Sequence, residues 1–313
     1  MRKDFVNEVA RTQEIKRADL IEKDLLLHQV LFDLSTNKFF HDNFVFKGGT
    51  CLAKCYLDYF RFSEDIDFTW KNQSAFEGKS QKEIRRYLSP VIDDVGEVFE
   101  EIAEKRGLDF RCLKGDRKYV ELAGGNKTCT FKVWYQSEVL GRRGFLKVQM
   151  NFVEKICYPF KSAELKSLIS RNQEELGLLF PEYMKYSQKI AFDVYDPKEI
   201  FAEKIRAVLT RRGIKARDFL DAYLISKSFD ISLKDIYNCV TDKTRFTLNL
   251  YARYRANLDQ KRSTILSAPF SWGEEKGLLL REIYEKDFYE FIERMKKFLM
   301  NVIEGLSGIE KGS

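Results

Sequence analysis

The sequence contains few of the residues that build the commonest catalytic and metal centres. Histidine occurs only twice, at His28 and His41, so a histidine-rich metal site or a Ser-His-Asp triad is nearly excluded. The six cysteines form no Cys-x-x-Cys pair, which favours reduced thiols acting as small apolar residues. Any bound metal is therefore expected to have oxygen ligands, which points to Mg²⁺.

Long apolar segments are also missing. No run of residues has the length needed to cross a bilayer. The first twenty residues lack the apolar core and the cleavage site of a signal peptide. We therefore expect a cytoplasmic protein with no membrane partner. The net charge of +6 is compatible with a polyanionic partner but does not require one.

The chain of 313 residues is long enough for two domains. Hydrophobic periodicity predicts helices over 14–35, 51–59 and 81–106, the last interrupted near Pro90, and strands at 44–46, at 65–68 and repeatedly within 108–152. Gly124-Gly125-Asn126 indicates a hairpin turn, and most of 161–304 has a helical pattern. The fold class is thus α+β, with a mixed sheet and flanking helices in residues 1–158 and a helical domain in 159–313.

Two carboxylates lie close together in the stretch KGGTCLAKCYLDYFRFSEDIDF, residues 47–68. In an extended strand Ser63, Asp65 and Asp67 share one face, and the two carboxylates stand about 6–7 Å apart along the backbone. Such a pair repels if it is buried without a partner, and a hard divalent cation accepts these oxygen ligands. The pair therefore predicts a Mg²⁺ site.

The same stretch begins with a glycine turn. Lys47-Gly48-Gly49-Thr50 ends a strand and enters a helix, so it offers backbone N–H groups and a hydroxyl to an anion. Either feature alone is common at turns and strand edges. Joined at this spacing, they suit the phosphates of a nucleoside triphosphate and the Mg²⁺ that accompanies it.

A second group of charges lies in the helical half. Asp196-Pro197-Lys198-Glu199 predicts a helix start with a capping box, and Gly213 predicts its end. Lys204 falls in the middle of the apolar arc of this helix, with Arg211 almost directly below it. A lysine there is costly unless it meets an anion. The alternative is a lysine that reaches the surface or pairs with a structural carboxylate.

Asp218 and Asp221 follow, one turn apart on the next predicted helix. Two carboxylates at this spacing share a helix face. The alternative for Asp218 is a capping role at the start of that helix.

The glycine turn followed by Asp-x-Asp resembles the nucleotidyltransferase superfamily, whose fold is DNA polymerase β-like. The stretch is more particularly similar to the AbiEii/AbiGii toxin family of abortive-infection systems, whose hallmark is KGGTSLxK…RFSEDIDF. Cys51 stands where serine is usual. Glu22-Lys23-Asp24, the EKxxAxxxR pattern around Lys204 and the RDxxD segment Arg217–Asp221 are also similar to family segments.

The resemblance implies a Mg²⁺-dependent nucleotidyltransferase. Asp65 and Asp67 become the catalytic metal ligands, Lys204 a triphosphate ligand and Asp218 a structural or catalytic acid, so that the helical domain contributes to the active site. The implied nucleotide-binding residues are Lys47, Gly48, Gly49, Thr50, Ser63, Arg211 and Asp221. Relatives modify RNA, notably the 3′ end of tRNA, and block translation; they are usually encoded with an antitoxin.

One expected acid is missing. Relatives commonly carry Glu or Asp on a later strand, for which the best candidate is 147–152, but Gln149 and Asn151 stand there and cannot act as bases. Either substrate deprotonation is left to Asp65, Asp67 or Asp218, or the chemistry is weakened. Gln149 also keeps open a catalytically degenerate regulator that binds a nucleoside triphosphate. A separate alternative is a transferase that modifies a protein hydroxyl instead of RNA.

A basic and aromatic segment is the candidate RNA-binding surface. Residues 245–255 mix arginines with aromatics, and a Lys-Arg pair follows shortly after. This interleaving suits phosphate contacts and base stacking, whereas the alternative is a solvated helix with a tyrosine-lined core face. The predicted RNA-binding residues are Arg253, Arg255, Lys261 and Arg262.

Overall fold

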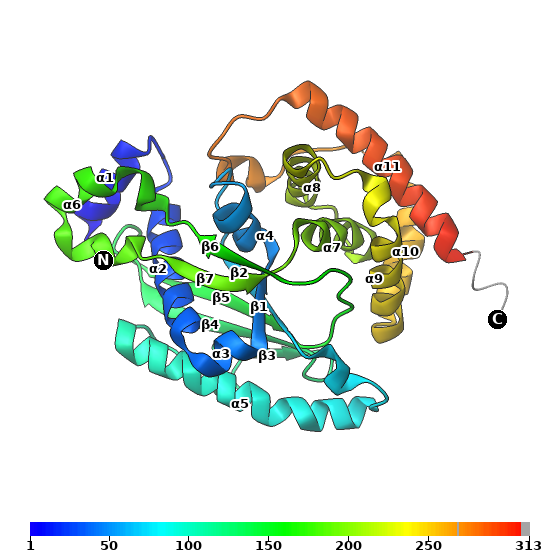
Figure 1. Cartoon of the computed structure of the whole chain (residues 1–313), viewed down its shortest axis with the longest axis horizontal. Helices are drawn as coiled ribbons and strands as arrows, with labels where there is room; N and C mark the ends of the chain where they lie inside the picture. Colours follow the sequence, from blue (N-terminus) through cyan, green and yellow to red (C-terminus); the bar gives the residue numbers. More distant parts are fainter. Residues whose placement is uncertain (268, 308–313) are drawn as a thin grey trace. The chain divides into compact units, whose positions relative to one another are not determined.

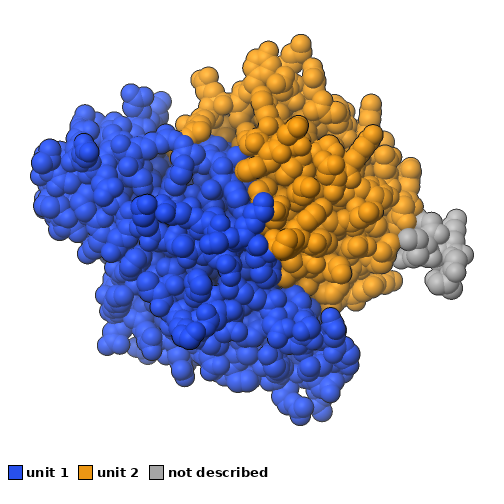
Figure 2. All heavy atoms as spheres, in the orientation of Figure 1, with its two compact units in different colours: residues 1–153, 160–194 blue, residues 154–159, 195–313 orange. Residues whose placement is uncertain are grey.

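The computed structural model describes residues 1–267 and 269–307. The chain forms two compact units (Figure 2): residues 1–153 with 160–194, and residues 154–159 with the chain from 195 onward. The first unit contains a mixed sheet with helices, and the elements of the second are helical, which confirms the predicted α+β class. Among the described residues, no helix combines the length and the apolarity that crossing a membrane requires.

The first unit is built on a seven-stranded sheet with the order β3-β4-β5-β2-β1-β7-β6. Its strands are β1 (Phe44–Lys47), β2 (Asp65–Trp70), β3 (Val120–Ala123), β4 (Thr128–Gln136), β5 (Arg143–Asn151), β6 (Lys161–Leu165) and β7 (Ile190–Val194). The pairs β2–β5 and β1–β7 are parallel, and the other neighbouring strands are antiparallel (Figure 1).

The helices of the first unit are α1 (Lys3–Thr12), α2 (Ala18–Thr36), α3 (Lys38–Asn43), α4 (Gly48–Cys51) continued by a π-helical turn (Leu52–Tyr56), α5 (Gln81–Arg106) and α6 (Gln173–Leu179), with 3₁₀ helices at Gln73–Phe76, Leu168–Asn172 and Pro181–Ser187. The second unit contains α7 (Pro197–Thr210), α8 (Ala216–Phe229), α9 (Tyr237–Leu250), α10 (Arg253–Thr264) and α11 (Glu285–Ser307), with 3₁₀ helices at Leu233–Ile236 and Glu274–Leu278.

The sheet has one apolar and one polar face. Along β4 and β5, buried residues alternate with half-exposed ones, as expected when one face is packed. On the apolar face Phe131 of β4 stacks on Phe99 of α5 with centroids 5.1 Å apart, and Phe68 of β2 meets Phe40 of α3 at 4.7 Å. The other side, called the polar face below, carries Thr130, Lys132, Lys147, Gln149, Asp65 and Asp67.

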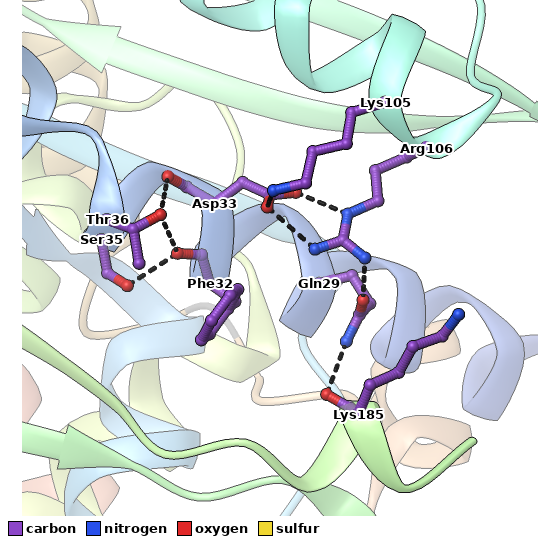
Figure 3. A network of polar contacts seen from close by, with 8 residues as sticks. All are labelled: Gln29, Phe32, Asp33, Ser35, Thr36, Lys105, Arg106 and Lys185. Atoms are coloured by element: carbon purple, nitrogen blue, oxygen red, sulfur yellow. Dashed lines mark hydrogen bonds and ion pairs between the residues drawn. The ribbon is translucent and has the colours of Figure 1, made fainter. Parts of the chain in front are cut away.

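A buried polar network joins α2 to α5 (Figure 3). The Asp33 carboxylate accepts hydrogen bonds from Lys105 at 2.7 Å and from Arg106 at 2.6 and 2.8 Å. Gln29 accepts a bond from Arg106 and donates to the backbone carbonyl of Lys185 at 2.9 Å. The bonds from Asp33 raise the pKa of Arg106, so these ion pairs hold the helical layer together at neutral pH.

The predicted interruption at Pro90 is wrong, because α5 runs without a break from Gln81 to Arg106. Proline removes one backbone hydrogen bond, but both helix ends are well satisfied. Ser80 and Glu83 form a capping box, and Gly107 ends the helix in the left-handed conformation. Apolar residues on both sides of the proline are buried, so packing outweighs the lost bond.

Two strands lie in the region that the sequence pattern assigns to helices. β6 and β7 pair antiparallel, and β7 extends the sheet beyond β1. The opposite difference occurs at residues 108–113, where Asp109 forms an isolated bridge to Trp134 and no strand follows. The predicted hairpin at 124–126 is confirmed: it joins β3 to β4, and all three residues have positive φ. Short strands depend on distant partners, which periodicity alone does not reveal.

Candidate active site

The first unit places the two predicted metal ligands together on the polar face. The β2 register sets Asp65 beside Lys147 of β5, and sets Asp67 between Lys47 of β1 and Gln149 of β5. The Asp65 side chain is 29% exposed, and its Oδ2 lies 3.7 Å from the Nζ of Lys147, which is 35% exposed. Asp67 is also half-exposed. Both carboxylates therefore sit at the boundary between the core and solvent.

The glycine turn packs directly against this pair. Gly48 has a φ of +78°, and a Cβ added to it would lie 2.4 Å from Oδ2 of Asp67. A Cβ at Gly49 would lie 2.5 Å from the guanidinium of Arg61 and 3.1 Å from Oγ of Ser63. Any side chain would displace these neighbours, so the turn requires both glycines. Ser63 precedes β2, and its hydroxyl lies close to the turn.

Several residues of the motif are buried supports. Arg61 is 1% exposed and donates to the carbonyl of Phe62 at 2.7 Å. The Thr50 hydroxyl is 1% exposed and donates to the backbone carbonyl of Asp65. The sequence pattern predicts that the Thr50 hydroxyl binds phosphate, but in the structure this hydroxyl joins the turn to β2. Lys47, also predicted to bind nucleotide, is buried in the register position opposite Asp67.

Three consecutive residues of α2 anchor three other parts of the site. Glu22 accepts bonds from the hydroxyl of Ser137 and from the backbone N–H of Glu138, after β4. Lys23 pairs with Glu64, just before β2, at 3.0 Å. Asp24 pairs at 2.9 Å with Lys54, in the turn that follows α4. Each of these contacts joins residues that are far apart in the sequence. The sequence therefore shows that the Glu22-Lys23-Asp24 segment is similar to a family segment, but it does not show which residues the segment contacts.

The polar face fits a hard divalent cation. Asp65 and Asp67 offer carboxylate oxygens on neighbouring positions of one face, and both are open enough to be reached. The register neighbours of β5 add an ammonium and an amide, and no carboxylate. The donor set at these positions therefore suits Mg²⁺ and is poor for a softer ion.

In the second unit, α7 begins at the position that the sequence predicts. Asp196 accepts a bond from the N–H of Lys198 at 2.8 Å, and Pro197 is the first helical residue. The predicted end at Gly213 is wrong, since α7 ends at Thr210 with Arg211 as its cap in an extended conformation. Glu199, expected in a capping box, accepts bonds from the N–H groups of Cys157 and Tyr158 at 3.0 and 2.8 Å.

Lys204 pairs with buried carboxylates of α8, which is the alternative given above for a lysine in this apolar arc. Its Nζ lies 2.6 Å from Oδ2 of Asp221 and 3.5 Å from Oδ1 of Asp218. Arg211 pairs with Oδ2 of Asp218 at 2.5 Å. Both carboxylates are fully buried, whereas Arg211 is 42% exposed. In this Lys204 cluster two cations balance two carboxylates, which favours a positioning role for Asp218.

The second unit contains a cluster of two thiols and a carboxylate that the sequence does not predict. Ligand atoms of Cys157, Glu199 and Cys239 lie within 4.8 Å of one another, although the residues are far apart in the chain. Lys243 lies 2.5 Å from Glu199, so the carboxylate already has a cation and two backbone donors. Burial acts to lower the pKa of Lys243, but Glu203 and Glu199 outweigh it and raise the pKa. The cluster is internally satisfied, and its cysteines are free thiols.

The predicted RNA-binding residues differ in accessibility. Arg253, Arg255 and Arg262 are exposed on α10. The guanidinium of Arg253 lies 4.9 Å from the ring centroid of Tyr254, and Arg255 donates to Asn249 at 3.4 Å. Lys261 is only 4% exposed, and burial lowers its pKa. An accessible basic surface on α10 therefore consists of the three arginines.

A glycine turn packed against Asp-x-Asp on the half-exposed face of a mixed sheet defines the protein as a nucleotidyltransferase. The chain belongs to the family described as nucleotidyl transferase AbiEii toxin of type IV toxin–antitoxin systems, whose model matches residues 29–304. Membership implies a nucleoside triphosphate as substrate and a cognate antitoxin, and this family generally uses a divalent metal.

Solved structures with a similar arrangement come from Helicobacter pylori. JHP933 is 14% identical, with a TM-score of 0.44, and the alignment covers 94% of this chain and 97% of that one. A candidate nucleotidyltransferase is 15% identical, with a TM-score of 0.43 and coverage of 92% and 97%. No curated protein matches the chain.

Proposed function

We propose that this nucleotidyltransferase transfers a nucleoside monophosphate from a nucleoside triphosphate to RNA in a Mg²⁺-dependent reaction, and that the acceptor is the 3′ end of tRNA. Modification of that end would block translation. The observation that carries the proposal is the Asp65–Asp67 pair on the polar face, packed against the Gly48–Gly49 turn. The RNA acceptor rests on the family resemblance and on the exposed arginines of α10.

In the proposed site, Asp65 and Asp67 hold Mg²⁺, which would offset negative charge on the triphosphate. Because neither glycine carries a side chain, the Gly48–Gly49 turn can pack closely against Asp67 and Arg61, and the proposal assigns the phosphates to the backbone N–H groups of that turn. Thr50 ties that turn to β2 through its hydrogen bond to the Asp65 carbonyl, and the buried Arg61 guanidinium lies against Gly49. In this proposal the chain contributes two carboxylates on β2 and the glycine turn that packs against them.

The proposed reaction is an in-line displacement. An acceptor hydroxyl oxygen forms a bond to the α-phosphorus, the bond from that phosphorus to the bridging oxygen breaks, and pyrophosphate leaves. The hydroxyl proton passes to Asp65, Asp67 or Asp218, since Gln149 cannot accept it. Lys204 as a triphosphate ligand, Arg211 and Asp221 as nucleotide contacts, and Asp218 as an acid remain predictions. The Lys204 cluster supports a role in which Asp218 positions the two cations.

The test is a labelling assay with the full chain, total RNA and each of the four α-³²P nucleoside triphosphates. We expect label on RNA of tRNA size from at least one nucleotide. Asp65→Ala and Asp67→Ala should lower transfer about 10³-fold, because a metal supplies several kcal/mol and each 1.36 kcal/mol is tenfold. Glu121→Ala is the matched control, since it removes an exposed carboxylate from β3.

The possible results separate the alternatives. Label on a protein from a cell lysate, with none on RNA, would replace the RNA acceptor by a protein hydroxyl. Nucleotide binding without release of pyrophosphate would indicate a degenerate regulator, which the amide of Gln149 makes a real competitor. Undiminished transfer by Asp65→Ala would reject the assignment of the metal site.

A further inference from the structure

The strand beside the carboxylate pair carries a cation and an amide where further acids could stand. Lys147 is the register partner of Asp65, and Gln149 is the register partner of Asp67. The Lys147 ammonium lies 3.7 Å from Asp65 Oδ2. Asp67 faces a second lysine, Lys47, on its other side in the register. The five register positions of the proposed metal site thus hold two carboxylates, one amide and two lysine ammonium groups.

This composition limits how many cations the polar face can hold. Two divalent ions about 3.5–4 Å apart repel strongly and are held together by carboxylates that bridge or flank them. At these positions only Asp65 and Asp67 offer carboxylate oxygens to a metal ion, and Lys147 and Lys47 are their register neighbours. A second ion on the β5 side would meet the Lys147 ammonium and the neutral Gln149 amide.

We propose that the site takes one divalent cation per bound nucleoside triphosphate, and that Lys147 is the fixed cation that occupies the place of a second ion. The inference rests on the proposed function and describes the metal requirement of that same site. Lys147 is a positioning residue, which orients Asp65 through their ion pair and keeps positive charge next to it. Gln149 leaves the position beside Asp67 without a charged ligand.

The chain offers a matched control for Lys147. Lys132 of β4 is the register partner of Lys147 on the same polar face, one strand further from Asp65. Its ammonium pairs with Glu121 of β3 at 3.1 Å. Replacing Lys132 therefore removes an equivalent half-exposed lysine and leaves the Asp65 pair intact.

The experiment counts metal ions directly. Full-length protein is dialysed to equilibrium against Mn²⁺ and radiolabelled α,β-methylene analogues of the four nucleoside triphosphates, and the retained Mn²⁺ is divided by the retained nucleotide. We expect a ratio of about one for the wild type and for Lys132→Met. Lys147→Met/Gln149→Asp, which removes the fixed cation and adds a ligand, should raise the ratio towards about two.

The outcomes keep this inference and the proposed function apart. A wild-type ratio of two, or a ratio that stays at one in the double variant, would overturn the inference and leave the transferase reaction standing. If Asp67→Ala retains as much Mn²⁺ and nucleotide as the wild type, the metal assignment in the proposed function fails instead. The wild-type ratio decides the inference even if the double variant does not fold, and Gln149→Glu provides a second variant with the added ligand.

Discussion

The carboxylates of the two units differ in their exposure to solvent and in their ion pairs. In the first unit Asp65 and Asp67 lie half-exposed on a sheet face, and the ion pair of Asp65 with Lys147 is long and open to water. In the second unit Asp218 and Asp221 are fully buried and are matched by Lys204 and Arg211. A half-exposed pair of carboxylates can be reached by a cation from solvent, whereas a buried and balanced cluster fixes the helices that carry it.

The largest contrast is expected in stability. Asp221→Ala leaves Lys204 buried with only its longer contact to Asp218, so we expect a loss of about 3–5 kcal/mol in the free energy of unfolding. Asp65→Ala removes only a partly exposed pair and should change stability by less than about 1 kcal/mol. Denaturant unfolding of both variants measures the difference. Equal losses of unfolding free energy in the two variants would show that both groups of carboxylates contribute alike to stability.

A pH series tests whether the first unit also contains a buried group that resists charging. His28 of α2 is fully buried, and its Nε2 lies 3.1 Å from the carbonyl of Gln188. Burial, with a smaller contribution from Lys54, lowers the pKa of His28 from 6.5 to about 3. Between these values the unfolded chain takes up the proton and the folded chain does not, so stability falls as the pH falls.

The corresponding measurement compares wild type with His28→Gln, which keeps an N–H donor but does not titrate. The free energy of unfolding of the wild type should lose up to about 1.4 kcal/mol more per pH unit, between pH 6.5 and 4, than that of the variant. Above pH 6.5 the two slopes should coincide. Parallel slopes across the acid range would mean that His28 becomes charged without unfolding.

The smallest effect concerns the exposed charges of the second unit. Arg253→Gln/Arg255→Gln/Arg262→Gln should reduce the slope of log K against log salt for tRNA binding by about 2, at roughly 0.7–0.9 per lost phosphate contact. Lys261→Gln is the matched control on the same helix, and since Lys261 is buried its slope should equal that of the wild type. An unchanged slope in the triple variant would place the RNA contacts elsewhere.

Local sequence predicts the site better than it predicts the sheet. Asp65 and Asp67 share a strand face by simple alternation, whereas the close approach of Asp67 and Arg61 to the two glycines is visible only in the structure. The sequence also predicts that Lys204 needs an anion, but it does not identify Asp221 as that anion. β6 and β7 escape prediction, since their pairing with the β1 edge depends on residues far away in the chain.

The Thr50 hydroxyl is an example of a contact that local sequence patterns do not predict. A hydroxyl after two glycines suits phosphate, but the fold directs it to the carbonyl of Asp65. In the same way, no spacing rule brings Cys157 next to Cys239 and Glu199, or Glu22 next to Ser137. These contacts join distant segments, so they exist only once the chain has packed.

The amino-acid sequence by itself determined the glycine turn, the carboxylate pair, the lysine that must find an anion and the family to which the chain belongs, because each depends on short-range geometry or on a local motif. The tertiary structure alone decided which cations stand beside those acids. Strand register brings Lys147 to Asp65 and Gln149 to Asp67 and leaves these acids half-exposed, whereas Asp218 and Asp221 are buried and paired with Lys204 and Arg211.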